Sequence, residues 1–159
     1  PENIADFSGR IYKEANRLGN LVADIIQLSR LDEQQDAVVS MESVELDELA
    51  KDVVNNLRDH AEKKNISLDY CGIPINIQGV RHVLYEMLYN IADNAVRYTN
   101  PGGHIHIYVG RKGNRPFYRV EDDGIGIPKS EQKRIFERFY RVDKSHSRQT
   151  GGTGLGLSI

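Results

Sequence analysis

The stretch RHVLYEMLYNIADNAVRYT, residues 81–99, predicts a long amphipathic helix, and the rest of the chain can be arranged around it. Apolar side chains recur along it at helical spacing. We expect one buried face to be formed by Val83, Leu84, Met87, Leu88, Ile91 and Ala95. The turn NPGG at 100–103 ends the helix, because proline and glycine interrupt regular structure.

A polar stripe runs along the same helix. Glu86, Asn90 and Asn94 are each four residues apart and therefore lie on one side. The stripe is either a solvated face or a ligand site, because buried amides without partners are costly. Two asparagine oxygens suit Mg²⁺, which keeps several waters and takes its charge balance from phosphates. Arg97 is placed to meet the same phosphates.

Alternating segments on both sides of this helix predict a sheet. They are expected as strands at 66–70, 74–78, 104–110 and 116–123. A second helix is expected over 44–65 and a short helical piece around KSEQKRIFERF, 129–139. The mixture predicts an α/β fold, a two-layer sandwich of helices on one sheet.

Two glycine-containing stretches carry the remaining chemistry. In EDDGIGIP, 121–128, Asp122 ends a strand, and Gly124 and Gly126 would let a flat ligand approach the backbone, although turns often contain such a string. In GGTGLGLSI, 151–159, exposed N–H groups and a helix starting near Gly154 would form an anion site. A flexible linker is the alternative for this second stretch.

Residues 2–32 form a helical arm with a heptad seam. Its apolar positions are Ile4, Phe7, Ile11, Leu18, Leu21, Ile25 and Leu28, with Glu14 the polar exception. The arm either packs on its own domain or belongs to a hairpin or bundle whose other helices lie elsewhere. Residues 33–43 read as a polar linker.

Composition limits the classes of function. The 159 residues carry a net charge of −2, which gives no reason to expect a nucleic-acid partner. Cys71 is the only cysteine, so an intrachain disulfide and a zinc cluster are excluded and a reducing setting is expected. No apolar run is long enough to insert into a membrane. The first and last residues suggest a piece cut from a longer protein.

In this order and spacing the motifs resemble the ATP-binding domain of sensor histidine kinases, within the gyrase, chaperone and MutL ATPase superfamily. YNIADNAVRYT resembles the N box, VEDDGIGIP the G1 box, IFERFYRVDKSHSR the F box and lid, and GGTGLGLSI the G2 box. RIYKEANRLGNLVADIIQLSRLD resembles the second helix of the dimerisation and phosphotransfer hairpin. The resemblance implies a Bergerat-type fold over 44–159, ending after the G2 box, preceded by the hairpin helix 1–32 and the linker 33–43.

The resemblance also implies roles for individual residues. Asn94 and Asn90 would bind Mg²⁺, Asp122 would receive the adenine amino group of ATP, and Arg138 would be a second cation for the terminal phosphates. The other residues expected around the nucleotide are Arg97, Tyr98, Gly124, Gly126, Ile127, Gly152, Thr153, Gly154, Leu155 and Gly156.

The implied activity is transfer of the γ-phosphoryl group to a histidine, for relay to a response regulator. None of the five histidines is followed by an acidic residue, so the phosphoacceptor is expected on a helix before Pro1 and self-labelling is not expected. The parent protein is expected to be a homodimer through the hairpin and a membrane sensor with this domain in the cytoplasm.

Two alternatives stay open. ATP-hydrolysing and serine-kinase relatives place Glu four residues before the metal-binding Asn, where this chain has Asn90, which cannot take a proton. A degenerate dimerisation module would not need competent side chains at every nucleotide position. His104 and His106 share one face of a strand, and without a third ligand we expect an ordinary sheet surface there.

Overall fold

The computed structural model describes residues 7–9, 11–12, 14–15, 18–19, 22, 40–138, 140–142 and 156–158. The chain divides into two compact units, 40–132 and a second one made of 1–39 together with 133–159. The first unit contains every strand that the structure describes. Its elements are β1 (Glu42–Glu45), α2 (Leu46–Lys63), β2 (Ser67–Gly72), β3 (Asn76–Gly79), α3 (Arg81–Tyr98), β4 (His104–Lys112) and β5 (Arg115–Asp122).

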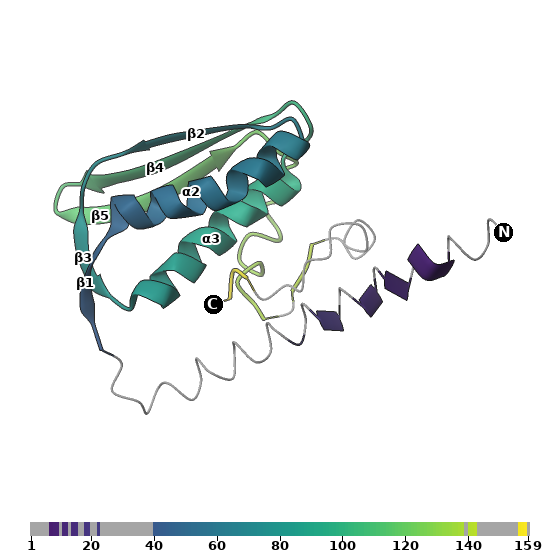
Figure 1. Cartoon of the computed structure of the whole chain (residues 1–159), viewed down its shortest axis with the longest axis horizontal. Helices are drawn as coiled ribbons and strands as arrows, with labels where there is room; N and C mark the ends of the chain where they lie inside the picture. The colour runs from purple at the N-terminus through teal and green to yellow at the C-terminus, as the bar shows by residue number, and fades with distance from the viewer. Residues whose placement is uncertain are drawn as a thin grey trace. The chain divides into compact units, whose positions relative to one another are not determined.

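Unit 40–132 has two layers, as expected. A three-stranded sheet has the order β2-β4-β5, with β2 parallel and β5 antiparallel to the central strand β4. The helices α2 and α3 lie side by side on one face of this sheet (Figure 1). A separate antiparallel pair joins β1 to β3.

The alternation of β4 decides which face is covered. Ile105, Ile107 and Val109 point toward the helices and are buried, whereas His104 and His106 are exposed on the opposite face. His104 contacts Asp123 and His106 contacts Asp69, so each imidazole faces a carboxylate on the open side of the sheet. Among the described residues, no three His, Cys, Asp or Glu side chains are grouped closely enough to hold a metal ion.

The predicted buried face of α3 was partly wrong. The buried residues are Leu88, Ala92, Ala95 and Val96. Met87, expected in the core, is 41 % exposed, and Ile91 is only half-buried. The face in contact with the sheet is therefore rotated toward the small alanines, which allow α3 to lie close to the strands.

Three further boundaries differ from expectation. Strand β1 occupies Glu42–Glu45, where the sequence suggested the end of a linker and the start of a helix. Residues 129–138 form turns in place of the expected helical piece. The described residues between 7 and 22 are helical, with Phe7, Ile11 and Leu18 each more than half exposed, and the remaining seam positions lie outside the described residues. Nowhere in the described part does a helix combine the length and hydropathy needed to cross a membrane.

Candidate functional site

Asp122 is the last residue of β5 and lies on the helix side of the sheet. In the register of the sheet it is paired with Ile105, whose side chain is buried beneath the helices. Residues directly opposite each other in an antiparallel pair share one face. The carboxylate of Asp122 is therefore exposed on the same side as α3.

The loop after β5 is fastened to the end of α3. The backbone N–H of Ile125 donates to the carbonyl of Tyr98 over 3.2 Å. The N–H of Gly124 donates to Oδ1 of Asp122 over 3.0 Å. A Cβ at Gly124 would lie only 2.5 Å from the Tyr98 carbonyl oxygen, so glycine is needed for this close approach. The structure thus brings together two of the three motifs.

A second anchor holds the same loop from the strand side. The carboxylate of Asp123 accepts the backbone N–H of His104 over 2.8 Å, and its other oxygen lies 3.0 Å from Nδ1 of the same residue. The backbone N–H of His104 is the main cause that lowers the pKa of Asp123. Gly126 has φ +67°, in the left-handed region that favours glycine. The loop that follows Asp122 therefore has a defined path.

The polar stripe of α3 is available to a ligand. Glu86, Asn90 and Asn94 are half-buried. Within the described part of the chain, no side-chain hydrogen bond engages either asparagine amide. Nε of Arg97 pairs with Asp93 one turn earlier. Two neutral amide oxygens on one helix face are a donor set that fits Mg²⁺ carrying its own waters and phosphate oxygens.

The loop after Asp122 contains exposed apolar side chains, and Tyr98, to which the loop is hydrogen-bonded, is partly exposed as well. Tyr98 is 40 % exposed, Ile127 is 44 % exposed and Ile125 is 67 % exposed. Exposed apolar groups next to one fixed acceptor are typical of a site for a flat heteroaromatic ring, which buries its faces and uses one edge for hydrogen bonding. The arrangement can bind a base at Asp122 and a metal-bound phosphate chain along α3.

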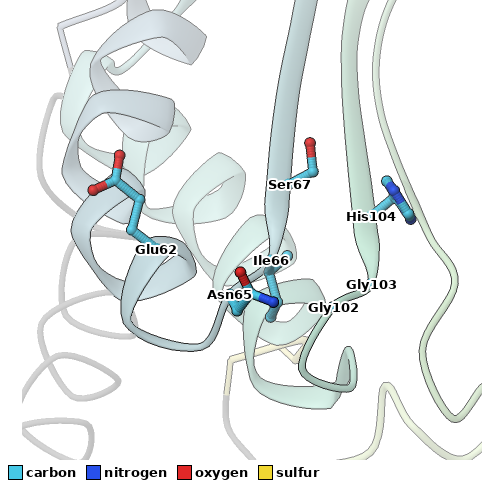
Figure 2. Close-up of a pocket in the computed structure, with 7 residues that line it drawn as sticks. All are labelled: Glu62, Asn65, Ile66, Ser67, Gly102, Gly103 and His104. Atoms are coloured by element: carbon cyan, nitrogen blue, oxygen red, sulfur yellow. The ribbon is translucent and has the colours of Figure 1, made fainter.

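Two surface hollows in the described part of the chain differ from this arrangement, and Glu86 is the one residue of the polar stripe that lines either of them. One, of about 400 Å³, is lined by Glu62, Asn65, Ile66, Ser67, Gly102, Gly103 and His104 (Figure 2). The other, of about 390 Å³, is lined by Leu49, Asp52, Arg81, His82, Tyr85 and Glu86. Neither contains Asp122 or Asn94. The candidate site is therefore the arrangement of the motifs and not either hollow.

The remaining predicted site residues fall elsewhere. Gly152, Thr153, Gly154 and Leu155 lie outside the described residues. Gly156 and Arg138 are described, both in turns, but they belong to the second unit. Their roles stay predictions.

Comparison with known proteins agrees with this geometry. A family model described as "Histidine kinase-, DNA gyrase B-, and HSP90-like ATPase" matches residues 79–159, just over half of the chain. The chain belongs to this ATPase family. The matched range begins at the end of β3 and includes α3, β4 and β5.

Within the ATPase family, the similar proteins are sensor histidine kinases. "Sensor-like histidine kinase SenX3" of Mycolicibacterium smegmatis is 33 % identical over 160 residues, covering 100 % of this chain and 41 % of SenX3. The chain therefore spans about two fifths of that relative. The structure of "Mycobacterial sensor histidine kinase MprB" has a TM-score of 0.65 at 26 % identity, covering 75 % of this chain and 74 % of MprB. Full-length ShkA in complex with AMPPNP has a TM-score of 0.70 at 28 % identity, covering 89 % of this chain and 29 % of ShkA.

Two residues of this ATPase domain were missed by sequence reasoning. Asp123 anchors the loop after β5, and its position between Asp122 and Gly124 was the available signal. Lys64 reaches from the end of α2 to the end of α3, where its Nζ lies 2.6 Å from the Val96 carbonyl. No pattern in the sequence indicates that contact, since lysines at helix ends are common and mostly solvated.

Proposed function

We propose that the chain is the ATP-binding catalytic region of a sensor histidine kinase, which transfers the γ-phosphoryl group of ATP to a histidine outside these 159 residues. One observation carries the proposal. The carboxylate of Asp122 lies on the same side of the sheet as α3, with its loop bonded to Tyr98, four residues beyond the unengaged amide of Asn94. Base and phosphate sites are thereby joined through one helix.

Each part of the site has a chemical task. Asp122 accepts a hydrogen bond from the adenine amino group, and Gly124 and Gly126 allow the ring to approach the backbone. Asn90 and Asn94 would hold Mg²⁺, which when bound neutralises phosphate charge. Arg97 would donate to the phosphates as cations do in other anion sites, and the sequence of residues 151–156 predicts backbone N–H donors of the same kind.

Transfer to histidine is favoured over hydrolysis by the residue at position 90. An amide cannot accept a proton from water, so Asn90 does not supply the general base that hydrolysis requires. A neutral imidazole is already a nucleophile, so transfer to histidine has less need of such a base. The site therefore needs chiefly to position and neutralise the phosphates, which dominates phosphoryl transfer.

The proposal extends to partners and location. The receiver domain of a response regulator would take the phosphoryl group from the acceptor histidine. The heptad arm would be one helix of a dimerisation hairpin, and its exposed Phe7, Ile11 and Leu18 would be covered in a homodimeric bundle. The parent protein would be a membrane sensor that presents this region to the cytoplasm.

Titration of the chain with ATP, with and without Mg²⁺, tests the proposal. Asp122→Asn keeps the oxygen that accepts from Gly124 but gives up the charge, so we expect ATP affinity to fall by about 1.5–3 kcal/mol. Glu121→Gln, on the open face of the sheet, is the matched control and should bind as the unmodified chain does. Circular dichroism checks folding. Equal affinity in a folded Asp122→Asn variant would overturn the assignment of the base site.

A further inference from the structure

We propose that Lys64 is a positioning residue of the nucleotide site, because it holds the end of α3 against which the loop after Asp122 is fastened. The inference rests on the proposed function. It concerns the residue that directly follows α2, outside the motifs, which contacts the proposed site only through the backbone at the end of α3.

The side chain of Lys64 satisfies most of the carbonyl groups at the end of α3. Its Nζ donates to the carbonyl of Val96 over 2.6 Å, to that of Arg97 over 3.0 Å and to that of Thr99 over 3.2 Å. An ammonium group has three N–H donors, so all of them are used. The last carbonyls of a helix lack partners within the helix, and a cation there also interacts favourably with the helix dipole.

Lys64 does not contact the carbonyl of Tyr98, and this is the carbonyl that holds the loop after Asp122. Tyr98 lies between Arg97 and Thr99, and its carbonyl oxygen accepts the N–H of Ile125. The three neighbouring carbonyls are thus held from the α2 side, and the remaining one is held from the loop side. A change in the direction of this turn would move the Tyr98 carbonyl and release the loop that follows Asp122.

The backbone around Lys64 is itself fixed to the turn after α3. The carbonyl of Asn65 accepts the N–H of Gly102 over 2.8 Å, and the N–H of Ser67 donates to the carbonyl of Gly103 over 2.9 Å. Figure 2 shows Asn65 beside these two glycines at one end of the sheet. Asn65 has φ +57°, which asparagine tolerates better than most residues. The turns that follow α2 and α3 therefore form one connected support.

Lys64 is partly buried, so its substitution differs from that of an exposed surface lysine. Burial lowers the pKa of Lys64, while the charge of Asp93 acts in the opposite direction. Its neighbour Lys63 has an exposed side chain on the same last turn of α2. Comparison of Lys64→Met with Lys63→Met therefore removes one positive charge in each case and deletes the carbonyl contacts in only one.

Two measurements on the whole 159-residue chain test the inference. Amide hydrogen exchange, followed by NMR, should show faster exchange at the Ile125 N–H in Lys64→Met than in Lys63→Met. Titration with MgATP should show an affinity about five- to tenfold lower for Lys64→Met, with Lys63→Met close to the unmodified chain. Exchange at amides of β4, distant from the turn, reports whether the fold is retained.

The results that would overturn the inference differ from the result that would overturn the proposed function. Unchanged Ile125 exchange and unchanged affinity in a folded Lys64→Met variant would overturn the inference. If Lys64→Met does not fold, Lys64→Gln, which keeps two N–H donors, should show faster Ile125 exchange than the unmodified chain, and an unaltered rate would refute the proposal. Failure of the unmodified chain to bind MgATP would sink the proposed function alone, because the Ile125 exchange comparison requires no nucleotide.

Discussion

The hydroxyl of Tyr70 on β2 donates a hydrogen bond over 2.6 Å to the carboxylate of Asp47 in the first turn of α2. The other oxygen of Asp47 accepts Nζ of Lys51 over 2.6 Å, and the residue is 2 % exposed. A Cβ at Gly72 would collide with the Tyr70 hydroxyl group and the Asp47 carboxylate, so glycine suits this position. The bonds join sheet and helix at the end opposite Lys64.

This buried carboxylate predicts a pH dependence of stability. The hydrogen bond from Lys51, followed by that from Tyr70, lowers the pKa of Asp47. A folded-state pKa below the unfolded value means that the stabilisation is present above about pH 4 and is lost as the pH falls through the folded value. We expect Asp47→Asn to lower the free energy of unfolding by about 1–3 kcal/mol at pH 7.

Urea unfolding between pH 7 and pH 3 measures this effect. The difference between Asp47→Asn and the unmodified chain should shrink on acidification. Asp52→Asn, whose exposed carboxylate lies 3.6 Å from Arg81, serves as the control and should change stability little. A difference that stays constant with pH would contradict the role given to the Asp47 charge.

Removal of the buried Thr99 hydroxyl is expected to raise the stability of the chain. It is 2 % exposed, and within the described part of the chain its Oγ1 has no hydrogen-bond partner. Thr99→Val exchanges that hydroxyl for a methyl group and should raise the free energy of unfolding by about 1 kcal/mol. Thr99→Ser, which deletes the methyl group near Gly103, should lower it. Loss of stability in Thr99→Val, measured by thermal unfolding, would reveal a partner for the hydroxyl.

Sequence patterns predicted the elements best where one periodicity was unambiguous. The alternation in residues 104–110 correctly predicted a strand, and the structure buries its Ile105, Ile107 and Val109. Met87 was misplaced because helical spacing defines an apolar side, but the small residues Ala92 and Ala95 decide which part of it meets the sheet. Strand β1 is short and largely polar, so it carries little signal of its own.

The sequence predicted the residues that would contact a ligand better than it predicted the residues that hold the backbone of the site in place. Asp122 and the asparagines of α3 could be proposed as site residues because their residue types and spacing suit a base and a metal ion. Lys64 and Asp123 act through contacts with backbone groups, and such contacts depend on which chain turns meet in space. The glycine-rich loop 151–156 is assigned from sequence, with only Gly156 among its residues described.

If Asn94 is a Mg²⁺ ligand as proposed, its loss should weaken ATP binding only when Mg²⁺ is present. Asn94→Ala removes an amide oxygen from the helix face without a change in charge, so ATP affinity in the presence of Mg²⁺ should fall at least about tenfold. Affinity in the presence of a chelator should change little. Asn55→Ala, on the exposed side of α2, is the matched control. A variant that keeps the full Mg²⁺-dependent gain in calorimetric titration would refute Asn94 as a ligand.

Substitution of Glu86 tests whether this carboxylate acts as a base in the proposed transfer. It lies one turn before Asn90, beside Arg81 and His82 in the wall of a hollow, and we expect it to brace the helix face without acting as a base. Glu86→Gln should leave ATP affinity within about twofold and should slow transfer to a supplied histidine hairpin less than Asn94→Ala does. Single-turnover transfer with labelled ATP measures this effect.

Two results would contradict the roles expected for Glu86 and Asn90. Loss of transfer in Glu86→Gln with intact ATP binding would make Glu86 the base. Brisk phosphate release by Asn90→Glu, measured at steady state, would show that a carboxylate at position 90 suffices for hydrolysis, whereas we expect little release because water must also be positioned.

The parallel pairing of β2 with β4 has a consequence for how the site is acquired during folding. Ser67 is paired with His104, and the connection between them contains the whole of α3. Closing so long a connection has an entropic cost that local contacts do not repay, so the pairing is a slow step. Lys64 precedes β2 in the chain, so its contacts with the end of α3 join segments from the two sides of this crossover. A nucleotide that binds only when this support has formed should therefore stabilise unit 40–132 as a whole against unfolding.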